Sequence, residues 1–178
     1  MKMKINIVGV VAALCLASSL AHGQAKIKLI NLDGPGVGLN DQTPVPALDG
    51  NVGKTLGQQR LIAFQYAADI WGALLRSGPE VRAEAAFVPF GCDKDGTALG
   101  GALYSKLVVA DLILPDGASD YSYPVAIANA ISGRDLNPEG NHIFSSFNSR
   151  IDELDCQQIA GVNGWYYGLH GNAGNPDF

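Results

Sequence analysis

The sequence TLGQQRLIAFQYAADIWGALLR, residues 55–76, predicts one long helix around which the rest of the chain is arranged. Thr55 and Gln58 have the spacing of a capping box, in which the two side chains satisfy N–H groups at the helix start. Residues 77–79, Ser-Gly-Pro, end the pattern, because glycine accepts the left-handed cap conformation and proline cannot continue a helix. Apolar residues recur every three or four positions and cover most of the circumference: Leu61, Ile62, Phe64, Tyr66, Ala68, Ile70, Trp71, Ala73 and Leu75. We therefore expect a buried helix whose large side chains each contribute about 1.5–3 kcal/mol.

Two segments with the periodicity of strands flank this helix. Residues 26–32, KIKLINL, alternate polar and apolar side chains, and residues 81–90, VRAEAAFVPF, alternate again until proline interrupts them. The glycine- and proline-rich region 34–54 between the first strand and the helix is typical of a surface loop. Its glycines do not have the G-x-G-x-x-G spacing, so the sequence does not predict a phosphate-binding loop there.

The second half of the chain predicts shorter elements. Residues 93–96, Asp-Lys-Asp-Gly, indicate a plain turn, since a calcium loop would need glutamate where Tyr104 stands. The remaining predicted elements are a strand or half-hairpin at 107–114, a short helix at 123–133 capped by Ser122 and ended by Gly133, a strand at 143–147, and a last aromatic strand, WYYGL, at 165–169. Together these elements predict an α+β fold, with a mixed twisted sheet packed on one long amphipathic helix.

Residues 1–23 have the features of a signal peptide. A short basic start precedes an apolar run at 5–16, which is too short to span a bilayer, and Ala21 and Gly23 are small residues where a signal peptidase reads the chain. Cleavage after Ala21 or after Ala25 is an alternative. A retained membrane anchor is a second alternative. We expect a secreted or periplasmic protein in which 24–178 form a single domain.

The charge of the mature part argues against two classes of partner. It keeps all 17 acidic residues and 10 of the 12 basic ones, a formal charge of −7. It contains no basic cluster that could neutralise phosphates. We therefore expect no nucleic-acid partner, and no membrane partner once the signal peptide is removed.

Two cysteines, Cys92 and Cys156, remain after signal cleavage. In an oxidising compartment an even pair of cysteines predicts a disulfide, which stabilises the fold by constraining the unfolded chain. A metal pair is the alternative interpretation, but neither cysteine has another cysteine or a histidine within four residues.

The sequence predicts no catalytic residue and no metal ligand. His142 and His170 are the only histidines after residue 23, and each stands alone. The chain has no G-x-S-x-G or H-E-x-x-H motif and no cysteine placed as a nucleophile. The acidic run of Asp152, Glu153 and Asp155 is typical of a solvated loop.

The order of elements is more informative than any single residue. A strand, a long helix containing tryptophan, a second strand, an inserted segment and two final strands resemble the N-terminal part of secreted bacterial zincin-like metallopeptidases, some of which carry a protease-associated domain. The resemblance covers nearly all of residues 27–178. Its motifs are GVGLND at 36–41, TLGQQRLIAF at 55–64, FNS at 147–149 and YGLHGN at 167–172.

The resemblance implies an incomplete peptidase domain. In that family an H-E-x-x-H helix follows the segment that matches 168–178, and its histidines bind zinc while its glutamate acts as general base. This sequence reaches Phe178 just before that helix, so the resemblance implies a subdomain that is inactive alone. Zinc and a peptide or protein substrate would belong to the full-length form. His170 stands where the family carries an acidic residue.

Two expectations follow for the structure. A sheet that lacks the zinc helix should leave an apolar patch near Trp165, Tyr167 and Leu169. The alternative function is a self-sufficient exported binding module without catalysis, whose ligand would occupy an apolar cleft beside the last strand.

Overall fold

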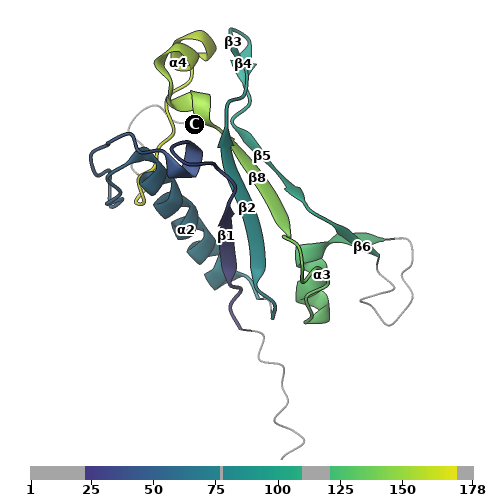
Figure 1. Ribbon diagram of the computed structural model, residues 1–178. Helices are drawn as coiled ribbons and strands as arrows, with labels where there is room; N and C mark the ends of the chain where they lie inside the picture. The colour runs from purple at the N-terminus through teal and green to yellow at the C-terminus, as the bar shows by residue number, and fades with distance from the viewer. Residues whose placement is uncertain (1–22, 77, 110–120, 172–178) are drawn as a thin grey trace, which may run out of the picture.

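The computed structural model describes residues 23–76, 78–109 and 121–171, and the predicted signal peptide lies almost wholly outside them. The described residues form a mixed α/β fold built on a four-stranded sheet in the order β1-β2-β8-β5 (Figure 1). β1 (Ile27–Asn31), β2 (Val81–Val88) and β8 (Ile143–Asn148) run parallel, and β5 (Gly100–Tyr104) is an antiparallel edge strand. The predicted mixed sheet and the strands at 26–32, 81–90 and 143–147 are thus confirmed.

The long helix α2 spans Leu56–Leu74, close to the predicted bounds. The Thr55 hydroxyl accepts the N–H of Gln58 at 3.2 Å, as predicted for the cap. The Gln58 side chain accepts the N–H of Lys54, one residue earlier than a capping box requires. At the other end Leu75 is extended and donates its N–H to the Trp71 carbonyl, so the helix stops before the predicted glycine.

The expected burial of α2 is wrong. Ile70, Trp71 and Leu74 are 46%, 57% and 71% exposed, whereas Ala68 and Gly72 are buried. A Cβ added to Gly72 would lie 2.5 Å from the Ala25 carbonyl oxygen, so the helix approaches the chain beside β1 through its smallest residues. This close approach decides which side faces inward, and the large apolar side chains project away from it.

The main hydrophobic core lies between the sheet and the N-terminal half of α2. Its buried members are Leu39, Ala85, Phe87 and Tyr167, and partly buried side chains from α2 and β8 pack around them. Leu39 comes from a short 3-10 helix, η1 (Gly38–Asn40), in the glycine-rich loop. The alternation of β2 therefore buries the predicted face, since Val81, Ala83, Ala85 and Phe87 are all buried.

The predicted last strand at 165–169 is wrong. This segment belongs to none of the described strands. Its polar backbone groups bind the 44–54 loop instead: the Leu169 N–H donates to the Asp49 carbonyl at 2.8 Å, and the Asn51 amide donates to the Tyr167 carbonyl at 2.7 Å. Because the loop supplies hydrogen-bond partners for these backbone groups, the segment can lie beside the sheet without pairing with a strand.

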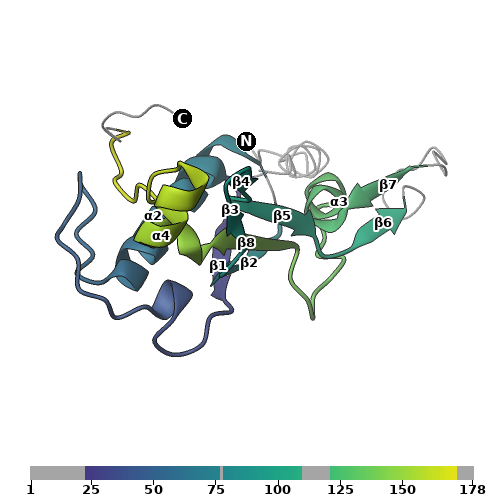
Figure 2. The same ribbon diagram turned by 90° about the horizontal axis from the view of Figure 1, so that it is seen from above.

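A separate arm projects from the side of the sheet opposite α2 (Figure 2). It contains a ribbon of β6 (Leu107–Val109) and β7 (Ser122–Pro124) and the helix α3 (Val125–Ser132). The predicted Ser122 cap is wrong, because Ser122 lies in β7, but Gly133 ends α3 in the left-handed conformation as predicted, with φ 67°. Positions 110–114 of the predicted strand lie outside the described residues.

The remaining elements surround the two cysteines. A small hairpin of β3 (Cys92–Asp93) and β4 (Gly96–Thr97) contains the predicted turn. A 3-10 helix, η3 (Ser149–Asp152), leads into α4 (Leu154–Ala160), which carries Cys156. The Cα atoms of Cys92 and Cys156 are 5.5 Å apart, within the range of a disulfide. None of the described helices is long and apolar enough to cross a bilayer.

Candidate functional site

An apolar groove of about 370 Å³ lies between α2 and the sheet. We call it the α2 groove. Ala63, Phe64, Ala67 and Trp71 of α2 form one wall, and Trp165 and Tyr166 close one end. The floor comes from alternate residues of β2 and β8: Ala83, Phe87, Ile143, Ser145 and Phe147. These floor residues share one face, because Ala83 pairs with Ile143 and Phe87 pairs with Phe147 in the parallel register.

The groove exists because α2 covers only part of that sheet face. The main sheet contacts of α2 are with β1, and Figure 1 shows the helix beside β1 with β8 and β5 farther away. The same face continues across β8, where Phe147 is only partly buried. Phe64 of α2 and Trp165 contact Phe147 and leave Ile143 and Phe147 only partly covered, although their side chains are those of a core.

Aromatic rings pack against one another along the floor of the groove. The Phe87 and Phe147 rings stack with centroids 5.1 Å apart, and the Trp165 ring meets Phe147 edge to face at 6.1 Å. Two hydrogen bonds hold Trp165 in place. Its ring N–H donates to the Asn148 carbonyl, and its backbone N–H donates to the Asp152 carboxylate. Aromatic pairs of this geometry add roughly 0.5–1.5 kcal/mol to the burial of the rings.

Arg60 is the one charged residue in the groove lining, and it is not free. Its guanidinium donates to Asp152 at 2.7 Å, to the Gly38 carbonyl at 2.8 Å and to the Tyr167 hydroxyl at 3.1 Å. The Tyr167 hydroxyl donates in turn to Asp152 at 2.7 Å. Burial, followed by the nearby Asp152 carboxylate, raises the pKa of Tyr167 well above its usual range. The phenol is therefore a neutral structural group at any ordinary pH.

Sequence reasoning missed both Arg60 and Asp152. Arg60 lies in the apolar stretch of α2 but is only 3% exposed, and Asp152 was assigned to a solvated loop. A polar residue inside an apolar helical face was the available signal, since buried charges in proteins are paired. No sequence rule identifies a partner from so distant a part of the chain.

The 44–54 loop positions the end of the groove. Asn51 is completely buried, and its amide also donates to the Gln59 carbonyl, so one side chain joins α2 to the Tyr167 backbone. Asp49 accepts the Tyr166 hydroxyl and contacts His170 Nδ1 at 3.1 Å. A glycine is needed at position 50, because φ is +84° and a Cβ would lie 2.6 Å from the His170 ring. The predicted exposed patch at 165–169 is therefore wrong for Tyr167, which is 7% exposed and bound into the core.

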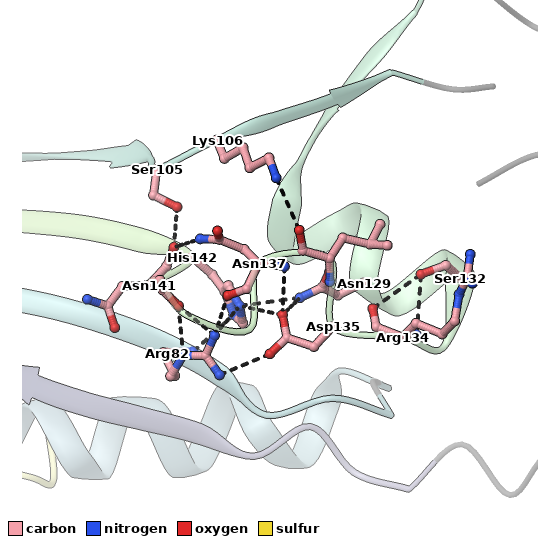
Figure 3. Close-up of polar contacts among 12 residues, drawn as sticks. Arg82, Ser105, Lys106, Asn129, Ser132, Arg134, Asp135, Asn137, Asn141 and His142 are labelled. Atoms are coloured by element: carbon pink, nitrogen blue, oxygen red, sulfur yellow. Dashed lines mark hydrogen bonds and ion pairs between the residues drawn. The ribbon is translucent and has the colours of Figure 1, made fainter. Parts of the chain in front are cut away.

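The two histidines after residue 23 lie in different surroundings. His142 is fully buried beside Arg82 and Asp135 (Figure 3), and His170 is a surface residue paired with Asp49. No group of three or more histidine, cysteine or acidic residues in the described chain could hold a metal ion.

Cys92 and Cys156 lie outside the groove. Their sulfurs join the β3–β4 hairpin to α4, which stands next to η3 and hence to Asp152. The pair is thus a tether of the segment that carries Asp152 and Trp165, not part of the groove lining.

The α2 groove is suited to binding and not to acid–base or nucleophilic chemistry. Its lining is almost wholly apolar, and its only ionised group is committed to Asp152. It would recognise an uncharged apolar surface, which gains free energy from leaving water. Comparisons with protein-family models, with curated proteins and with solved structures found no match to this chain.

Proposed function

We propose that this chain is the N-terminal subdomain of a secreted zincin-like metallopeptidase, inactive alone, and that the α2 groove is the seat of the zinc helix. The observation that supports this is the apolar groove beside α2, where the β8 side chains Ile143 and Phe147 on the sheet face are only partly buried. A sheet in a zincin packs that face on two helices, and here only one is present among the described residues. The zinc, the general base and the peptide substrate then belong to the longer protein.

The shape of the wall is compatible with a second helix. Helices pack with their axes about 8–10 Å apart, and the smaller distances need small side chains at the contact. Ala63 and Ala67 lie one helical turn apart on α2 and line the groove. The segment 165–167 also lines it, so the chain leaves the groove about a dozen residues before the position where the zinc helix would begin.

The coding sequence beyond Phe178 gives the first test. We expect an H-E-x-x-H motif within about 20 codons, in this frame or in one restored by a frameshift. A coding sequence without that motif in any frame would contradict the proposal.

A matched pair of substitutions gives the second test. Ala67 and Ala73 are both exposed alanines of α2, but only Ala67 lines the groove. In a chain extended through the motif, Ala67→Glu should lower stability sharply, because an unpaired carboxylate would be buried under the added helix. Ala73→Glu should change it little, and neither substitution should matter in the chain that ends at Phe178. Equal effects of the two substitutions in the extended chain would contradict the proposal that the zinc helix occupies the α2 groove.

A self-sufficient exported binding module is the second candidate function. The groove volume of about 370 Å³ is that of a small-molecule pocket. Its apolar lining favours an uncharged apolar ligand. N-phenyl-1-naphthylamine, an uncharged fluorescent probe, would bind the present chain with 1:1 stoichiometry under this alternative. Ala67→Glu would abolish that binding and Ala73→Glu would preserve it. Absence of binding would contradict this alternative, whereas binding that disappears in the chain extended through H-E-x-x-H would favour the peptidase subdomain.

A further inference from the structure

The arm is a separate packing unit. We define it by residues 105–109 and 121–141, which leave the sheet at the end of β5 and return to it at β8. Val108, Val125 and Ala128 form a core of its own, with Tyr123 and Leu136 packed against it, and this core shares no residue with the main one. The stronger contacts of α3 are with β6 and β7. Polar contacts connect it to the sheet.

A polar cluster makes that connection, and we call Arg82, Asn129, Asp135 and His142 the latch (Figure 3). Asn129 and His142 are fully buried, and Arg82 and Asp135 are partly exposed. From β2, the Arg82 guanidinium donates to Asp135 at 3.0 Å and to the carbonyls of Asn137 and Gly140. From α3, Asn129 accepts the Leu136 N–H and lies 3.3 Å from Asp135. The latch thus joins the sheet, the arm helix and the loop that follows it.

His142 occupies the centre of the latch in one protonation state. Its Nδ1 accepts the backbone N–H of Arg82 at 3.2 Å, so the proton of the neutral ring is on Nε2, which lies 3.2 Å from Asp135 Oδ1. Nε2 also lies 3.2 Å from the Arg82 guanidinium and 3.4 Å from the Asn129 amide nitrogen; with the proton on Nε2, these are contacts between donors and not hydrogen bonds. A second proton would have to sit on Nδ1, where it would meet the Arg82 N–H and place another cation beside the guanidinium.

We propose that the latch is acid-sensitive: protonation of His142 releases the arm from the sheet while the sheet and α2 stay folded. The inference is independent of what occupies the α2 groove. It rests on a fully buried ring with a committed acceptor nitrogen, at the junction of two separate cores.

The charges around the ring set the direction. Burial and then Arg82 lower the pKa of His142, and Asp135 opposes them only in part. The other charged groups nearby are occupied, since Glu84 of β2 accepts the Asn141 amide and Lys106 donates to the Leu136 carbonyl. In the released arm the ring regains its ordinary pKa near 6.5, so release takes up a proton and becomes more favourable as the pH falls below that value.

The difference between the pKa of His142 in the latched arm and in the released arm sets how strongly release depends on pH and over which pH range. If the latched ring stays neutral, the opening equilibrium rises up to about 30-fold between pH 7.5 and pH 5. Burial would raise the pKa of Asp135, but the Asn137 N–H and Arg82 outweigh it and hold this pKa below its usual 3.8. Protonation of the carboxyl therefore adds to release only in more acidic solution. The interval from pH 7.5 to 5 isolates the histidine.

Amide hydrogen exchange on this chain, corrected for intrinsic rates, tests the latch. Between pH 7.5 and 5 we expect the α3 amides to lose protection by up to about 30-fold while those of β2 and β8 keep theirs. His142→Gln should remove the pH dependence, because the amide can still accept and donate but does not titrate. His170→Gln, the surface control, should behave as the parent. Constant α3 protection, joint loss in α3 and the sheet, or an unchanged pH dependence in His142→Gln would overturn the proposal.

A second measurement covers the case in which His142→Gln fails to latch the arm. Nitrogen NMR of the parent protein should show the Nε2–H tautomer at pH 7.5 and a His142 titration whose midpoint coincides with the opening of α3. A ring that titrates near pH 6.5 without any change in α3 would overturn the proposal.

Discussion

The guanidinium carbon of Arg60 lies 4.3 Å from the centre of the Phe87 ring, so the deepest charge of the main core sits directly on its aromatic floor. This contact combines a cation–π interaction with the ion pair to Asp152. Removal of the guanidinium would leave the Asp152 carboxylate and the Tyr167 hydroxyl short of a partner. The stability of the core and the shape of the α2 groove therefore depend on the same residue.

Arg60→Met should destabilise the fold by about 3–5 kcal/mol, because it breaks a buried ion pair and strands one partner. Urea unfolding followed by tryptophan fluorescence measures the change. Arg150→Met is the control. Arg150 also pairs with two carboxylates, but its partners Glu153 and Asp155 are exposed, so its loss should change stability little. Equal midpoints for the two variants would contradict the buried role of Arg60.

Asn51→Ala should also cost stability, by about 1–3 kcal/mol, because the carbonyls of Gln59 and Tyr167 lose a buried donor. The same change should loosen the 165–170 segment and red-shift the Trp165 emission, best seen in a Trp71→Phe background. Asn163→Ala, at an exposed position, serves as the comparison. A stable Asn51→Ala variant with unchanged emission would show that the loop does not hold this segment.

Gly72→Ala reports on the orientation of α2. In an exposed helix interior this change stabilises by about 1 kcal/mol, since alanine loses less backbone entropy than glycine. Here the added methyl group would meet the Ala25 carbonyl, so we expect a loss of about 1–3 kcal/mol in thermal unfolding. Asp69→Ala, on the exposed part of α2, controls for helix propensity. A stabilised Gly72→Ala protein would mean that another side of the helix faces β1.

Cys92 and Cys156 should form a disulfide in protein purified from an oxidising compartment. Thiol titration under denaturing conditions should then find neither cysteine free, and reduction should cost about 2–4 kcal/mol of stability. Cys92→Ser/Cys156→Ser, which should be insensitive to reductant, is the control. Two free thiols in the untreated protein would contradict the pairing that their 5.5 Å Cα separation permits.

Local signals in the sequence determined the approximate bounds of α2, β1, β2 and β8. Thr55 identifies the start of α2 because a cap is a contact between near neighbours, and Gly133 ends α3 for the same reason. The alternation in β2 predicts its buried face, since successive side chains of any strand point to opposite sides. The count of cysteines predicts one disulfide, and the fold then places the two Cα atoms 5.5 Å apart, which a disulfide can span.

Only the tertiary structure decided which surfaces meet. An apolar pattern around the whole of α2 does not say which side is inward, and Gly72 settles this by allowing a close approach at Ala25. The segment 165–169 has the composition of a strand. Its backbone groups nevertheless form hydrogen bonds with Asn51 and Asp49 and not with a neighbouring strand. Arg60 and Asp152, like Arg82 and His142, meet across long stretches of chain. Such contacts depend on how separate elements pack, and periodicity carries information only about neighbours along one element.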